Sequence, residues 1–272
     1  MIRGLRKIAA FLVRDARAWA SYRFSMALQL ASIFFSLIVW FFISNAVSVN
    51  DGSAIQEYTN NYFDFVVIGI AVAGYVTVSL SGFASHIREA QISGTLEALL
   101  VTPTSIPTLV LGSTVGDYAG ATARLMGLLV FAGTIFQVPI VWTSLPAAAF
   151  VLFLTILAFS GIGLLSASFV MVFKRGDPLA QAIAWFSMLL GGVYFPTRSV
   201  GEPALESLAE WLPLTPALKA LRFLLLRGDS LADVSDLVVR LALMAAVLLP
   251  AGLLAFTAGV RHARRSGSLT HY

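Results

Sequence analysis

The side chains of this chain that could take part in chemistry are few, and most of them lie in one short stretch. That stretch runs from His86 to Pro103, HIREAQISGTLEALLVTP, and is polar between long apolar segments. The motifs of common catalytic and nucleotide sites are missing from the sequence, which contains no GxxxxGK[ST], no HExxH and no GxSxG. Cysteine is absent as well, which excludes disulfides, thiolate metal sites and thiol catalysis. We therefore expect no catalytic residue, no metal site and no cofactor on this chain. We expect the stretch His86 to Pro103 to act as a contact surface for another molecule.

The polar stretch has the periodicity of a short amphipathic helix. Its apolar face consists of Ile92, Leu96, Leu99 and Leu100, and its other faces carry Arg88, Glu89, Gln91, Thr95 and Glu97. Ser93 and Gly94 are suited to open a helical turn, and Thr102-Pro103 ends it. We predict a helix over residues 87–101 that presses on something outside the bilayer.

Two charged residues, Asp117 and Arg124, interrupt an otherwise apolar segment. An ionised side chain in the middle of a bilayer is costly and usually faces a bundle interior or water. One interpretation is that they contact a substrate or an ion on a translocation path. The other is that the helix begins below the membrane plane, so that both lie near the cytoplasmic interface. Their spacing of seven residues puts them on one face two turns apart, so we expect no direct ion pair.

The composition is typical of a protein that crosses a membrane several times. Of the 272 residues, 58% are hydrophobic and only 12% are charged, whereas about 25% are charged in soluble domains. The net charge of +4 does not indicate a nucleic-acid partner, because the basic residues lie at the ends of apolar segments, where they act as topology signals.

Six apolar segments are each near the ~20 residues that cross a bilayer core. They comprise residues 25–47, 65–85, 107–138, 146–173, 178–195 and 237–260. A basic amphipathic helix is predicted over residues 1–23, because its Arg and Lys residues lie away from an apolar stripe, as in helices of the headgroup region. A signal peptide is the competing interpretation, but the next apolar run is too long and no cleavage site is evident. Together these elements predict one all-α polytopic membrane domain over residues 1–272.

The distribution of Lys and Arg predicts that both termini are cytoplasmic. The two short loops 48–64 and 139–145 carry no basic residue. The opposite ends of the spans carry Arg3, Arg6, Lys7, Arg14, Arg17, Arg23, Arg88, Lys174, Arg175, Arg261, Arg264 and Arg265. The helix predicted over 87–101 then faces the cytosol.

The segment between the fifth and sixth predicted spans is too apolar for a free loop. It contains the sequence WLPLTP at residues 211–216, followed by an apolar helical run over 217–226. Because broken backbone at membrane depth must be covered by protein, we predict a re-entrant or interfacial helical pair over 203–227 on the outer side. The alternative is an amphipathic helix on the outer surface without a gating role.

The polar stretch resembles the signature region of the ABC-2 type permeases, the membrane subunits of ATP-driven exporters. In that family the segment after the second span is approximately ExxxGTLExLxxTP, and this chain has Glu89 followed by GTLEALLVTP at residues 94–103. The segment after the fifth span is also similar, with GVYFP at 192–196, LPLTP at 212–216 and Leu221-Arg222. The resemblance covers essentially the whole chain.

The resemblance implies a partner and a mechanism. Residues 87–101 would be a coupling helix seated in a cleft of a separate ATP-binding subunit, present in two copies with two permeases, so that a homodimer is expected. That partner would bind ATP and Mg²⁺, since the chain itself has no P-loop. The expected contact residues are Arg88, Glu89, Ile92, Gly94, Thr95, Leu96, Glu97, Leu99, Leu100 and Pro103. The outer segment would form an extracellular gate with Tyr194, Phe195, Pro196, Trp211, Pro213 and Pro216.

The resemblance further implies export across a bacterial or archaeal plasma (inner) membrane. The apolar and aromatic first span is compatible with an amphipathic drug or a lipid-like substrate. A permease for lipid-linked polysaccharides or other glycoconjugates is the alternative within the family. From other classes, a secondary carrier would need intramembrane ionisable groups or inverted repeats, and a non-transporting scaffold would leave the signature stretch unexplained.

Overall fold

A computed structural model of the chain describes residues 23–46, 54–94, 106–173, 178–197 and 203–265. Within these ranges the chain forms helices and no strand, which confirms the all-α prediction for them. The long helices are α2 (Arg23–Ala46), α3 (Tyr62–Ile92), α5 (Ile106–Thr134), α6 (Leu145–Phe173) and α10 (Ser235–Arg265). The shorter ones are η1 (Trp142–Ser144), α7 (Pro178–Leu190), α8 (Pro203–Glu210), α9 (Leu214–Arg222) and the π-helical turn η3 (Phe223–Arg227).

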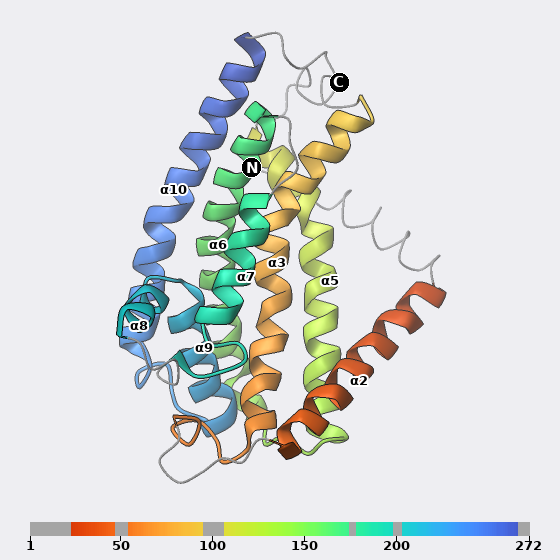
Figure 1. Cartoon of the computed structure of the whole chain (residues 1–272), viewed down its shortest axis with the longest axis vertical. Coiled ribbons are helices and arrows are strands. Elements are labelled where there is room, and N and C mark those ends of the chain that lie inside the picture. Colours follow the sequence, from red (N-terminus) through yellow and green to blue (C-terminus); the bar gives the residue numbers. More distant parts are fainter. Residues whose placement is uncertain (1–22, 47–53, 95–105, 174–177, 198–202, 266–272) are drawn as a thin grey trace.

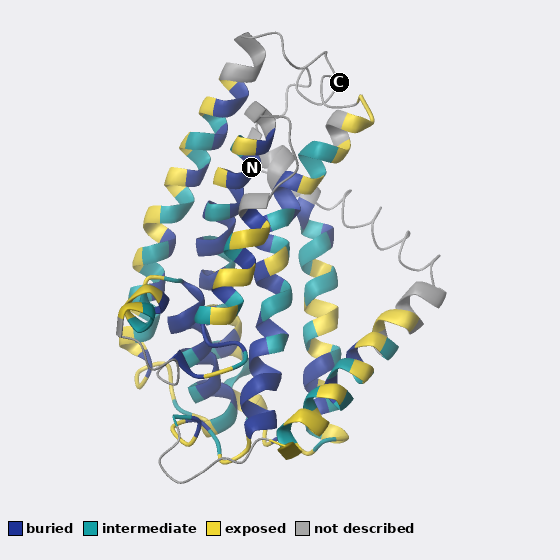
Figure 2. Ribbon diagram, in the orientation of Figure 1, coloured by how far each residue is buried: buried dark blue, intermediate teal, exposed yellow. Residues whose placement is uncertain are grey.

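Helix α3 is the central element of the bundle (Figures 1 and 2). In an apolar 18-residue window of Tyr62–Glu89, 72% of the residues are buried inside the protein, against 17% in the corresponding window of Ser235–Arg261 of α10. Helices α5 and α6 pack against α3, and α10 packs along α6. A displacement of α3 would therefore change its packing against α5 and α6 and, through α6, the position of α10.

Glycines allow the tightest of these helix crossings. A Cβ at Gly163 of α6 would collide with the carbonyl oxygen of Ser79 on α3. Likewise, Gly161 of α6 and Gly252 of α10 each meet the backbone of the other helix. Small residues permit such close approach between helices in membranes, where apolar side chains gain little by leaving lipid.

Three helical segments in the described part of the chain are long and apolar enough to cross a membrane: Tyr62–Glu89, Trp142–Val170 and Ser235–Arg261. Two shorter apolar segments are Ala31–Ala46 and Ala180–Leu190. The structure therefore supports a membrane protein, and the count of six spans stays a prediction. The amphipathic helix predicted over 1–23 lies almost entirely outside the described residues.

Helix α7 is shorter than the span predicted over 178–195. It ends at Leu190 after 13 residues, because Gly192 adopts a φ of +89° and turns the chain. The left-handed region is accessible to glycine at little cost. Residues 191–195 consequently form a turn beside α3, where a Cβ at Gly69 would collide with the carbonyl oxygen of Val193.

Helix α3 is longer than the span predicted over 65–85. It continues to Ile92, where the amide of Ser93 donates to the carbonyl oxygen of Glu89 and Gly94 follows with a φ of +67°. Ser93 and Gly94 thus follow the end of α3, and the turn that the sequence predicts them to open lies beyond Gly94, outside the described residues. Residues 87–92 of the predicted coupling helix are the last turns of α3, which ends there because glycine is the usual residue just after a helix C-terminus.

Candidate functional site

The end of α3 is joined to α5 by a polar contact between His86 and Asp117. The Nε2 atom of His86 lies 2.7 Å from Oδ2 of Asp117, and its Nδ1 atom lies 3.9 Å from the carboxylate of Glu89. The imidazole therefore lies between two carboxylates, one on each helix. Asp117 is accordingly satisfied within the chain, close to the end of α3.

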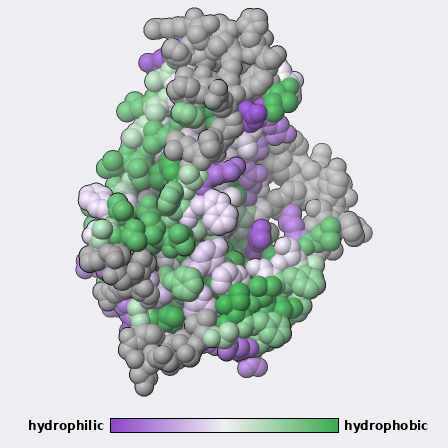
Figure 3. All heavy atoms as spheres, in the orientation of Figure 1, coloured by the Kyte–Doolittle hydropathy of each residue, from purple (hydrophilic) through white to green (hydrophobic). Residues whose placement is uncertain are grey.

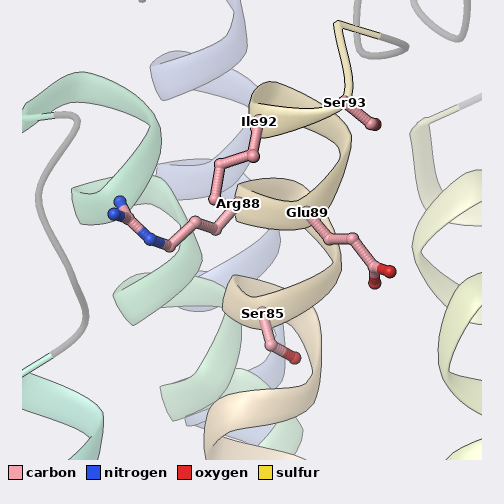
Figure 4. Close-up of a pocket in the computed structure, with 5 residues that line it drawn as sticks. All are labelled: Ser85, Arg88, Glu89, Ile92 and Ser93. Atoms are coloured by element: carbon pink, nitrogen blue, oxygen red, sulfur yellow. The ribbon is translucent and has the colours of Figure 1, made fainter.

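Beyond His86, the last two turns of α3 form an exposed surface (Figure 4). Its open pocket of about 450 Å³ is lined by Ser85, Arg88, Glu89, Ile92 and Ser93. Arg88 and Glu89 point to different sides of the helix, and the side chain of Ile92 is 67% exposed. An apolar side chain flanked by a cation and an anion suits contact with a protein surface rather than catalysis.

The remaining residues of the predicted coupling helix, Thr95, Leu96, Glu97, Leu99, Leu100 and Pro103, lie outside the described residues. The structure does show from where this segment departs. It follows directly on Gly94, at the end of the most buried long helix.

A line of hydroxyl groups continues from His86 into the bundle between α3, α5 and α6. The Tyr118 hydroxyl donates to Oγ of Ser79 at 3.1 Å and lies 2.9 Å from Oγ of Ser160. Further along, the Tyr75 hydroxyl donates to Oγ1 of Thr122 at 2.8 Å. These contacts fix the register of the antiparallel pair α3 and α5.

Arg124 and Asp117 lie in the same apolar segment of the sequence, but the structure gives the two side chains different surroundings. Arg124 is exposed, and no hydrogen bond or ion pair joins it to another described residue. Leaving an arginine at the centre of a transmembrane helix costs about 2.5–3.5 kcal/mol on insertion scales. The structure therefore separates the two charges, one paired near a helix end and one without a partner in the described chain.

At the opposite end of the bundle, Arg222 of α9 is a buried cation. Its Nη2 atom donates to the carbonyl oxygens of Gly192 at 2.8 Å and Val193 at 3.3 Å, and Nε donates to the carbonyl oxygen of Phe65 at 3.1 Å. The guanidinium also lies 3.4 Å from the centre of the Phe65 ring. Burial lowers the pKa of the Arg222 guanidinium to about 9, so the group stays protonated at neutral pH. One side chain thereby joins α9, the turn after α7 and the first part of α3.

Two of the predicted gate residues, Tyr194 and Phe195, follow directly on the turn that binds this cation. The ring of Tyr194 stacks on Trp40 of α2 with centroids 5.1 Å apart, and the ring of Phe195 lies 6.2 Å from that of Tyr62. Pro196, Pro213 and Pro216 are buried. Trp211, which follows α8, is 79% exposed, and Leu208 of α8 is 58% exposed. Trp211 therefore lies apart from the buried contacts of Arg222.

Sequence reasoning did not select His86, Tyr118 or Arg222 as site residues. Arg222 carried a signal in the sequence, since it is one of two cations, with Lys219, within the apolar run 217–226. A cation so placed needs buried acceptors. The acceptors are backbone carbonyls, which no sequence motif identifies.

Comparison with known proteins agrees with this architecture. Residues 10–226 match the ABC-2 type transporter family. A stretch of 165 residues is 28% identical to the inner membrane transport permease YadH of Escherichia coli K12, and the same values apply to the YadH proteins of Escherichia coli O157:H7 and Shigella flexneri. That alignment covers 60% of this chain and 62% of each relative. Because the family match extends over most of the chain, the protein belongs to the ABC-2 type transporter family.

Proposed function

We propose that this chain is the permease subunit of an ATP-driven exporter in a bacterial or archaeal inner membrane. It moves an amphipathic drug or lipid-like molecule out of the cytoplasm or the inner leaflet. A separate ATP-binding subunit, in two copies, supplies the energy by binding ATP and Mg²⁺, and two permease copies form the path. Family membership and the permease relatives support the transport role.

The observation that carries the proposal is the continuity between the signature stretch and α3. The stretch 94–103 begins where α3 ends, and α3 is the most buried of the long apolar helices. A partner that presses on this stretch acts directly on the centre of the bundle. Interfaces and packed helices respond to such a push by switching between discrete arrangements.

The far end of α3 offers a route to the outer side. There Phe65 accepts from Arg222, which also binds the turn after α7. A shift of α3 is therefore transmitted to the turn that carries Tyr194 and Phe195. We assign to this cluster the role of the outer gate.

The test is a charge-reversing double substitution in the signature stretch. Glu97→Lys with Leu100→Asp replaces an acidic and an apolar contact, because apolar anchors and charge complementarity hold such interfaces together. We expect the permease to lose co-purification with its ATP-binding subunit, or to hydrolyse ATP without moving substrate.

The matched control is Glu206→Lys with Leu208→Asp on α8, at the opposite end of the bundle. It makes the same chemical changes on a half-buried glutamate and an exposed leucine, away from the proposed contact. The control complex should assemble and transport as the unmodified protein does. Normal assembly and transport in the Glu97/Leu100 variant would refute the proposal.

A further inference from the structure

Arg124 lies near the middle of the apolar part of the bundle. Tyr75 is at the centre of the apolar stretch Tyr62–Glu89 of α3, and its hydroxyl binds Thr122 of α5. Arg124 follows Thr122 by two residues, which is about 3 Å along the helix. His86 lies about 16 Å from Tyr75 along α3 by the same rise, so Arg124 is far deeper than the His86–Asp117 contact.

The apolar segments of the chain hold no further acidic side chain that could pair with Arg124. Asp117 is the one carboxylate in segments 25–47, 65–85, 107–138, 146–173, 178–195 and 237–260, and it already binds His86. A second copy of the chain would bring the same set of residues. An anion that meets Arg124 in the middle of the membrane therefore comes from a molecule other than this protein.

Helix α2 leaves Arg124 accessible. On the same face of α5, two turns further on, the ring of Phe131 lies 6.3 Å from Phe34 of α2, and this marks where the two helices meet. From that contact the N-terminal half of α2 diverges from α5 (Figure 1). Figure 3 shows hydrophilic residues between the bundle and α2, within a largely apolar surface.

Helix α2, which borders this opening, carries exposed apolar side chains. Its exposed side chains include Leu28, Phe35 and Val39, with exposures of 55%, 65% and 53%. An exposed cation in the apolar part of the bundle, next to exposed hydrocarbon, matches a molecule with an acidic headgroup and an apolar tail. Charge-assisted bonds to phosphate are also the contacts for which arginine is best suited.

We infer that the opening between α2 and α5 binds an acidic amphiphile of the membrane, with a phosphate-type headgroup on Arg124 and its apolar tail along α2. The inference rests on the proposed function in that it narrows the exported molecule to an anionic lipid-like class. It assigns to Arg124 a place on the path between the two leaflets.

Binding is tested on the purified permease alone, with phosphatidylglycerol as the acidic probe and phosphatidylcholine as the zwitterionic one. Native mass spectrometry counts the lipids retained at each concentration. We expect Arg124→Gln to weaken phosphatidylglycerol binding about tenfold or more and to leave phosphatidylcholine binding unchanged. Arg124→Lys should keep most of the preference, because it retains the charge.

The matched control is Arg240→Gln, which also removes a cation from a long apolar helix. Arg240 already binds the backbone carbonyl and the carboxylate of Glu210 at 2.6 and 3.5 Å, so its loss should leave phosphatidylglycerol binding intact. Unchanged phosphatidylglycerol binding in Arg124→Gln, or an equal loss for both lipids in Arg124→Gln and Arg124→Lys, would overturn the inference. Displacement of the lipid by millimolar inorganic phosphate would also overturn it, since the site would then select a free anion.

The same variants in proteoliposomes with the ATP-binding subunit separate this inference from the proposed function. ATP-dependent movement of fluorescent phosphatidylglycerol should fall in Arg124→Gln and persist in Arg240→Gln. If the complex forms no ATP-driven transporter while the isolated permease still binds phosphatidylglycerol through Arg124, the proposed function fails and the binding site stands.

Discussion

The guanidinium of Arg222 lies over the ring of Phe65 at 3.4 Å, and the same group donates a hydrogen bond to the backbone carbonyl oxygen of that residue. It also binds the carbonyl oxygens of Gly192 and Val193. A single cation thus satisfies three backbone acceptors on two segments and attaches both to α9. This end of the bundle is held together by charge and hydrogen bonding, in addition to apolar packing.

Replacing Arg222 should destabilise the fold. Arg222→Met leaves the carbonyl oxygens of Phe65, Gly192 and Val193 without their donor, and a buried unsatisfied group costs about 1–3 kcal/mol. We expect a lower midpoint of thermal unfolding in detergent, with a smaller loss for Arg222→Lys, which keeps the charge but lacks the planar fork of donors.

The exposed Arg227 provides the control for this prediction. Its guanidinium donates to the carbonyl oxygen of Glu57 and lies 3.6 Å from Asp229, at half-exposed positions. Exposed ion pairs contribute about 0–1 kcal/mol, so Arg227→Met should shift the midpoint only slightly. Equal shifts for the Arg222 and Arg227 variants would show that the buried contacts do not stabilise the fold.

Adding a methyl group at Gly163 should push α6 away from α3. The new Cβ would collide with the carbonyl oxygen of Ser79, and overpacking typically costs about 1–3 kcal/mol. Gly74→Ala on α3 is the control, because nothing lies within 4 Å of its Cβ position. Replacing glycine by alanine inside a helix raises the free energy of unfolding by about 0.5–1 kcal/mol. Thermal unfolding of the two variants should move in opposite directions, and a stable Gly163→Ala protein would contradict the close crossing.

The contact between His86 and Asp117 predicts different outcomes for two substitutions of the carboxylate. Asp117→Asn can still hydrogen bond with His86 and should lose little stability. Asp117→Ala removes the partner of a half-buried imidazole, and we expect a loss of about 0.5–1.5 kcal/mol, the net value of a typical hydrogen bond. A double-mutant cycle with His86→Ala measures the coupling between the two residues. Additive losses would show that the two side chains do not interact.

The helices themselves could be predicted closely from the sequence. Helix α6 is observed at Leu145–Phe173 and was predicted at 146–173, and α5 is observed at Ile106–Thr134 and was predicted at 107–138. Long apolar runs form helices because the backbone can satisfy its hydrogen bonds within the segment when no water is available. The larger differences fall at glycines: α7 ends before Gly192 and α3 before Gly94, both with positive φ. A glycine within an apolar run is compatible with a helix or with a turn, and packing against α3 selected the turn at residues 191–195.

The sequence by itself determined that this chain is helical and membrane-embedded, and its signature stretch indicated the family. Those properties depend on composition, period and short motifs, which are local. Only the tertiary structure decided which charges have partners. It brings Arg222 to Phe65 across 157 positions and His86 to Asp117 across 31, and it leaves Arg124 without an acceptor among the described residues. Asp117 and Arg124 look alike in the sequence, but charge pairing depends on what neighbouring helices place within a few ångströms, and helix packing alone sets that.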